Sequence, residues 1–122
     1  MPGHNYWVYI LFDKPAGATY IGVTNDLKRR VFEHKMELIP GFTQDKHIHN
    51  LGYFEEYKYI DKAIAREKAL KKWKRAWKYK LIETMNPDWH DLASDIDEYI
   101  ARIQHAKDTA IVWVWLAFAR TV

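Results

Sequence analysis

The 122-residue sequence contains no cysteine. Disulfide bonds, thiolate zinc sites and cysteine nucleophiles are therefore excluded together, and the lack of disulfides fits a reducing compartment. The chain also lacks internal repeats and low-complexity linkers. Hydrophobic residues make up 48% of the sequence and aromatic residues 16%, so we expect one folded domain with a substantial core rather than a disordered chain.

The sequence also lacks targeting and membrane-spanning features. The N-terminal stretch MPGHNYWVYILF has neither a basic n-region nor a small-residue cleavage site. The apolar run AIVWVWLAFA at residues 110–119 is too short to span a bilayer, which takes roughly 20 residues. We therefore expect a cytoplasmic protein without a membrane partner. The run itself is read as an added strand, a terminal segment packed on the core, or a surface for self-association.

Acidic residues are scarce in the middle of the chain. Between Lys58 and Lys80, only Asp61 and Glu67 oppose ten lysines and arginines. Residues 83–98 reverse this balance, because every charged residue among them is acidic. A basic segment beside an acidic one indicates a polyanionic partner, and the alternative is a lysine-rich helix face in water.

Hydrophobic patterning predicts three strands. Residues 6–12 and 19–23 are short runs rich in aromatic and β-branched residues, and the turn sequence DKPAG joins them into an expected antiparallel hairpin. Residues 51–57 predict a third strand. Alternation along the first strand places Tyr9 on the same face as Trp7 and Leu11, where it is expected to lie across from Tyr20.

A first helix is predicted from Thr24 or Asn25, either of which can cap it, to Pro40-Gly41. Its buried stripe, counted at about 100° per residue, is formed by Leu27, Val31, His34 and Leu38. Arg30 falls at the border of this stripe, whereas Arg29 faces away. Arg30 is therefore the arginine expected to be held rigidly.

A second helix is predicted from Asp61, and Glu67 falls within its apolar arc at about 40° from Ala63. Trp73 and Trp77 are expected to face inward, with a break or bend between Arg75 and Tyr79. Pro87 ends a further helical turn, and residues 89–92 are expected to close the core. Residues 94–97 have the spacing of a capping box and predict a helix to about residue 107.

Tyr9, Tyr20, Arg30, His34 and Glu67 together suit the hydrolysis of a phosphodiester. A helix carboxylate can hold Mg²⁺, with water and substrate phosphate completing the octahedron. An arginine can donate two parallel hydrogen bonds to phosphate oxygens and stabilise the pentacoordinate charge. A tyrosine whose pKa is lowered by nearby cations can orient or deprotonate the attacking water. These groups suffice for one-metal hydrolysis.

In order and spacing, these residues resemble the GIY-YIG nuclease family. The two halves of the name motif are Val8-Tyr9-Ile10 and Tyr20-Ile21-Gly22. Arg30 and His34 match the helix residues of the motif, and Glu67 in AREK matches its metal-binding glutamate. The phrases YIGVTNDLKRR, AREKALKKW and NPDW are similar to the small stand-alone branch, whose relatives include the incision domain of the UvrC repair protein and homing endonucleases. The resemblance covers residues 5–92.

The resemblance implies an α+β domain at residues 1–92, with a three-stranded antiparallel sheet flanked by helices, and a C-terminal extension at residues 93–122. It also implies metal-dependent nicking or cleavage of double-stranded or branched DNA, in repair or recombination.

The implied site roles follow the motif. Tyr20 would act on the water with support from Tyr9, Arg30 would steady the phosphate, His34 would assist, and Glu67 would bind Mg²⁺ or Mn²⁺. Asn86 matches an asparagine near the site of some members. The residues expected to contact nucleic acid are Lys68, Lys71, Lys72, Lys74 and Arg75.

Several alternatives remain at this point. Val23 stands where the UvrC branch has a lysine, and Val8 stands where the motif has glycine, which leaves open a nucleic-acid-binding module without turnover. Taken singly, the two tyrosines can be core aromatics, and Glu67 can simply pair with Lys71 one turn later. His47 and His49 lack a third ligand of suitable spacing and do not predict a metal site.

Overall fold

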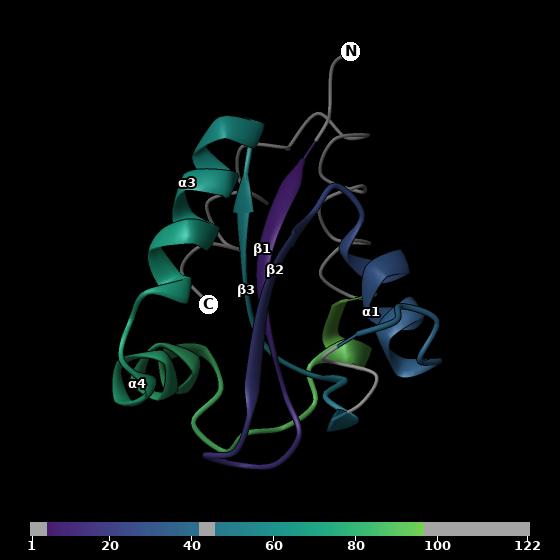
Figure 1. Cartoon of the computed structure of the whole chain (residues 1–122), viewed down its shortest axis with the longest axis vertical. Coiled ribbons are helices and arrows are strands. Elements are labelled where there is room, and N and C mark those ends of the chain that lie inside the picture. Colours follow the sequence, from purple (N-terminus) through teal and green to yellow (C-terminus); the bar gives the residue numbers. More distant parts are fainter. Residues whose placement is uncertain (1–4, 42–45, 97–122) are drawn as a thin grey trace, which may run out of the picture.

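The computed structural model describes residues 5–41 and 46–96, which form a small antiparallel sheet flanked by helices (Figure 1). The elements in chain order are β1 (Tyr6–Phe12), β2 (Thr19–Thr24), α1 (Leu27–Lys35), β3 (Asn50–Tyr57), α3 (Ile60–Lys71) and α4 (Arg75–Met85). The predicted α+β class and the three predicted strands are therefore confirmed.

The strands are ordered β2-β1-β3, and both pairings are antiparallel. Because β1 is the central strand, its backbone is paired on both sides, and every residue after Tyr6 in it is buried. The pairing with β3 shifts after Ile10, so that Gly52 is an extra residue on β3, as in a β-bulge. The motif Val8-Tyr9-Ile10 thus lies on β1, which is the most enclosed of the three strands.

The two faces of the sheet carry separate apolar clusters, as the alternation along β1 predicts. On one face, Tyr9 and its neighbours pack against α1 and residues 92–96. On the other face, Val8 and Ile10 pack against α3 and α4. Figure 1 shows α1 on one side of the sheet and α3 and α4 on the other.

Helix α1 ends at Lys35, earlier than the predicted end at Pro40-Gly41. Glu37 adopts a left-handed φ of 56°. The N–H of Leu38 donates to the carbonyl of Glu33 at 2.9 Å and that of Glu37 to His34 at 3.0 Å, which is the Schellman pattern of a helix end. Leu38 is therefore 63% exposed, and its predicted place in the buried stripe is wrong.

The cap of α1 is Asp26, rather than Thr24 or Asn25. The Asp26 carboxylate accepts a hydrogen bond from the N–H of Arg29 at 3.1 Å. Thr24 instead accepts from the N–H of Asp26 at 3.1 Å and turns the chain from β2 into the helix. The helix thus begins at the predicted junction after β2, but the prediction of Thr24 or Asn25 as its cap is wrong.

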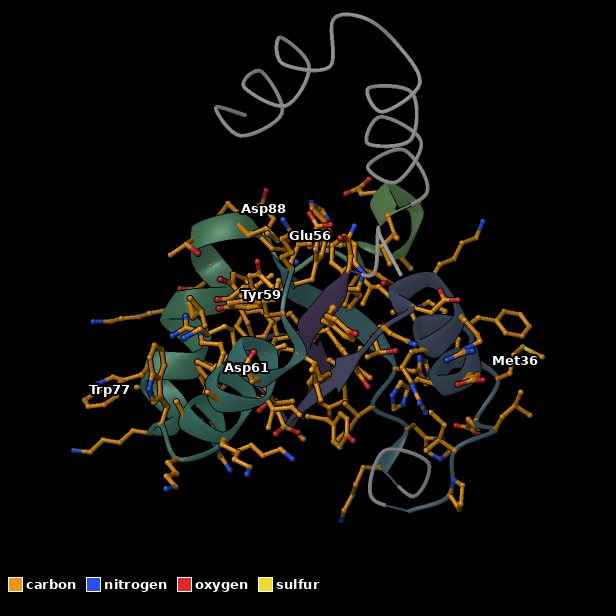
Figure 2. The ribbon with its side chains drawn as sticks, turned by 90° about the horizontal axis from the view of Figure 1, so that it is seen from above. Met36, Glu56, Tyr59, Asp61, Trp77 and Asp88 are labelled. Atoms are coloured by element: carbon orange, nitrogen blue, oxygen red, sulfur yellow. The ribbon has the colours of Figure 1, made fainter. Side chains whose placement is uncertain are left out.

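The break between α3 and α4 comes at residues 72–74, earlier than predicted. The chain turns where Lys72 and Trp73 donate back to Ala69 and Leu70, and Lys74 is extended. This early break restarts the helical phase, so the angle counted for Trp77 from Ala63 no longer applies. Trp73 packs against the core, but Trp77 is 51% exposed, and its predicted inward orientation is wrong (Figure 2).

The last described segment closes the core at Leu92, as predicted, and Ile96 is buried beside it. Its helical residues begin at 93, before the predicted capping box, because the Asp91 carboxylate accepts from the N–H of Ala93 at 3.1 Å. The same carboxylate accepts from Leu51 in β3 at 3.0 Å. The predicted helix to residue 107 and the apolar run at 110–119 lie outside the described residues. Within those residues, no helix has the length and apolar character to cross a membrane.

Candidate active site

Three rings meet on the face of the sheet that α1 covers. The Tyr9 hydroxyl lies 3.0 Å from Nε2 of His34. The Tyr20 ring lies 5.5 Å from the His34 ring and 6.3 Å from the Tyr9 ring, measured between centroids. In the strand register, Tyr9 pairs with Gly22 and Tyr20 with Leu11, so the tyrosines are diagonal neighbours rather than directly opposite as predicted.

Gly22 makes room for the Tyr9 ring. A Cβ atom built on Gly22 would lie 2.4 Å from the Tyr9 hydroxyl oxygen and 2.5 Å from Cζ. Real side chains do not approach this closely. The glycine of the second half-motif therefore positions the tyrosine of the first half, which in turn contacts His34.

The Tyr9 hydroxyl stays protonated at neutral pH. Burial is the main cause that raises its pKa, and the charges of Tyr20 and Glu67 raise it further, against an opposing effect of Arg30. Tyr9 is thus suited to donate or accept a hydrogen bond, while Tyr20, which is only partly buried, is the tyrosine that water can reach.

His34 is neutral at neutral pH. Burial and then the nearby positive charge of Arg30 lower its pKa from 6.5 to about 4. A neutral imidazole offers one donor and one acceptor, so His34 can take part in a single hydrogen bond with Tyr9 through Nε2. Its buried Nδ1 has no hydrogen-bond partner among the described residues.

This pKa predicts a loss of stability in mild acid. Because the unfolded chain binds a proton at about pH 6.5 and the folded chain only near pH 4, the free energy of unfolding should fall by on the order of 2 kcal/mol as pH drops through this range. Urea unfolding of the wild type and of His34→Gln, which keeps a hydrogen-bonding group but cannot titrate, would measure the difference. Parallel profiles for the two proteins between pH 4 and 6.5 would contradict this prediction.

Arg30 projects from α1 toward the same region. Its side chain is 34% exposed, against 54% for Arg29, which agrees with the predicted orientations of the two arginines. Nη1 of Arg30 lies 3.5 Å from Glu33, and the buried Nε has no partner among the described residues. Arg30 borders an open pocket of about 270 Å³ whose other lining residues are Tyr6, Val23, Thr24, Asn25 and Ile60.

Glu67 is the carboxylate that α3 contributes. Its side chain is only 15% exposed, in agreement with its predicted place in the apolar arc, and it pairs with Lys71 at 2.9 Å. The described residues contain no group of three or more metal-ligating side chains. The donor set fits Mg²⁺, because Mg²⁺ is commonly held by one or two carboxylates, with waters and substrate phosphate as its other ligands.

Comparison with known proteins identifies the family. The model of the GIY-YIG catalytic domain matches residues 5–80. The chain belongs to the GIY-YIG nuclease family. Among solved structures, a UPF0213 protein from Bacillus halodurans, determined by solution NMR, is similar at 25% identity over 71% of this chain and 92% of that chain, with a TM-score of 0.46. A search of curated proteins found no match. The division of the chain at residue 92 stays a prediction.

Asn86 ties the loop after α4 to the sheet through hydrogen bonds from its side chain to the backbone. Asn86 is buried and directly follows α4. Its side-chain NH₂ donates to the backbone carbonyls of Gly52 and His90, and its side-chain carbonyl accepts from the backbone N–H of His90 at 2.9 Å. These contacts join the loop after α4 to β3. Within the described part of the chain, its hydrogen bonds do not reach the Tyr9–His34 pair.

The residues expected to contact nucleic acid lie where α3 meets α4. All of them are exposed, namely Lys68, Lys71, Lys72, Lys74 and Arg75. The sequence reasoning missed the pocket beside Arg30, whose residues Thr24 and Asn25 were considered only as helix caps. The position of Asn25, directly between the strand motif and the arginine helix, is the signal from which it could have been found.

Proposed function

We propose that this protein is a metal-dependent endonuclease that hydrolyses phosphodiester bonds in DNA. The observation that carries the proposal is the hydrogen-bonded Tyr9–His34 pair with the Tyr20 ring beside it. Arg30 lies one helical turn before His34 on α1, and Glu67 is the mostly buried carboxylate of α3. These five side chains come from β1, β2, α1 and α3. Membership of the GIY-YIG nuclease family supports the same chemistry.

In this proposal each residue of the chain has a distinct task. Tyr20 orients the attacking water by hydrogen bonding, since its ring is the more accessible of the two tyrosines. Tyr9, held by His34, fixes the position of Tyr20. Arg30 donates to phosphate oxygens as the water attacks phosphorus and the bond to the leaving oxygen breaks, and its charge stabilises the pentacoordinate transition state.

Glu67 is the residue that would hold Mg²⁺ or Mn²⁺. The bound ion would supply Lewis-acid stabilisation of the charge on the phosphate oxygens. Lys71 pairs with this carboxylate at 2.9 Å, so its ammonium group would compete with a cation for the Glu67 oxygens.

The test is nicking of supercoiled plasmid. We expect nicking with Mg²⁺ or Mn²⁺, complete loss with EDTA, and a decrease of about 10²-fold or more in Glu67→Gln, because the carboxylate that binds the metal is gone. Asp61→Asn is the matched control, since Asp61 is an exposed carboxylate in the first turn of the same helix. Nicking by Glu67→Gln at the wild-type rate would reject the assigned site.

A second candidate is a nucleic-acid-binding module without turnover. It is favoured by Val23, which lines the pocket beside Arg30 where the UvrC branch has a lysine. This candidate predicts binding that weakens steeply with salt and no cleavage of intact, nicked, branched or single-stranded DNA with any divalent metal. One cleaved substrate would eliminate it.

A further inference from the structure

Trp77 is exposed in a way that packing does not explain. Its ring is 51% exposed, and Figure 2 shows it projecting outward from α4 at the edge of the molecule. Tryptophan is highly buried on average, because its ring carries much apolar area. The Trp73 ring, which packs against the core, meets Trp77 edge-on at 6.1 Å with an interplanar angle of 86°. Trp73 therefore anchors the Trp77 ring while leaving much of it in water.

The surroundings of Trp77 are strongly basic. Nζ of Lys74 lies 5.7 Å from the centroid of the Trp77 ring. Lys71, Lys72 and Arg75 are exposed nearby in the chain, and no acidic residue occurs between Lys68 and Lys80. A partner suited to this surface combines flat apolar rings with negative charge. Nucleic acid has both, and an apolar protein groove lacks the charge.

Continuous duplex DNA has no free base face on which Trp77 could stack. In a continuous duplex, both faces of each base are covered by neighbouring bases, and exposing a face costs unstacking energy. Unpaired bases have free faces, and aromatic side chains stack on them with little regard to sequence. The exposed tryptophan thus distinguishes single-stranded from double-stranded segments, whereas the lysines bind the phosphates of either.

We propose that Trp77 stacks on an unpaired nucleobase while Lys74 and its neighbours bind the flanking phosphates, so that the protein prefers DNA with a single-stranded arm, such as a fork or flap, over continuous duplex. This inference rests on the proposed function, for which it names the substrate class. The preference resides on α4, apart from the rings that meet beneath α1.

The inference is tested by binding in EDTA, where no cleavage takes place. Three labelled DNAs of shared sequence are compared: a single strand, a duplex and a fork. Trp77→Ala should weaken binding of the single strand and the fork about 5- to 100-fold and leave duplex binding unchanged, while Trp77→Phe keeps most of the affinity because a ring remains. Equal losses on all three DNAs, or no loss, would overturn the proposal.

Phe32→Ala is the matched control, because Phe32 is also an exposed aromatic, at 56%, but lies on α1. It should leave all three affinities unchanged. A second readout guards against misfolding of the alanine variant: oligothymidylate should quench tryptophan fluorescence in the wild type and quench it less in Trp77→Phe. Undiminished quenching in Trp77→Phe counts against stacking.

The dependence of the binding constant on salt concentration distinguishes the contribution of the Trp77 ring from that of the charged side chains. Trp77→Ala should lower the affinity for the single strand without changing the slope of log K against log salt concentration. Lys74→Gln should reduce that slope by about 0.7, the value for one phosphate contact on a single strand. A change of slope in Trp77→Ala would show that the ring acts through the charges rather than by stacking.

The two proposals fail in different ways. Preference for forks that depends on Trp77, without cleavage under any metal, supports stacking and rejects the endonuclease. Cleavage by a protein whose fork preference survives Trp77→Ala supports the endonuclease and rejects stacking.

Discussion

Arg30→Ala should slow plasmid nicking by about 10²- to 10³-fold, the usual loss when a positioned donor to a transition-state oxygen is removed. Arg30 borders the pocket, and its positive charge lowers the pKa values of both Tyr9 and His34. Single-turnover rates with saturating Mn²⁺ would measure the effect on the chemical step. The metal dependence should be unchanged, because Glu67 is intact.

Arg29→Ala is the internal control for this experiment. It removes the same charge one residue earlier, from a side chain that faces solvent and lies 3.9 Å from Glu33. Its nicking rate should stay within about threefold of wild type, since exposed charges contribute little. Arg30→Lys should be intermediate, because lysine keeps the charge but loses the planar fork. Equal defects in the two alanine variants would mean that the helix contributes only general positive charge.

Gly22→Ala is expected to destabilise the fold by about 1–3 kcal/mol, typical of overpacking in a core, and to abolish most nicking. The added methyl group would overlap the Tyr9 ring, with Cε1 at 2.9 Å and the hydroxyl closer still. Tyr9 can yield only by leaving its position against His34. Urea unfolding and plasmid nicking measure the two effects separately.

A double-mutant cycle tests whether the clash with the Tyr9 ring causes the destabilisation by Gly22→Ala. In the Tyr9→Ala background the ring is gone, so Gly22→Ala should cost far less stability than it does in the wild type. An equal cost in both backgrounds would show that the strand itself rejects alanine, rather than the tyrosine.

The sequence predicted best where one regular element fixed the spacing. The phase of α1 distinguished Arg30 from Arg29 and placed His34 inside, because these residues lie within one unbroken helix. It predicted poorly beyond helix ends. Leu38 follows a left-handed residue that is glutamate rather than glycine, which removes the usual signal of a helix end.

Trp77 was misplaced for the same reason, since the chain turns between α3 and α4 without glycine or proline. The closeness of Tyr9 and Gly22 depends on the strand register, which residue spacing alone leaves open. By contrast, helix spacing within α3 both placed Glu67 inward and offered the i,i+4 ion pair with Lys71 that the structure contains.

The strand order β2-β1-β3 gives the two tyrosines different freedom of movement. Tyr9 lies on the middle strand, whose backbone hydrogen bonds are enclosed on both sides, so it is released only when the whole domain unfolds. Tyr20 lies on an edge strand, which can open locally at much lower free energy. Within the site, Tyr9 is therefore held in place, whereas Tyr20 can change position. Local opening of β2 can therefore move Tyr20 while Tyr9 keeps its place against His34.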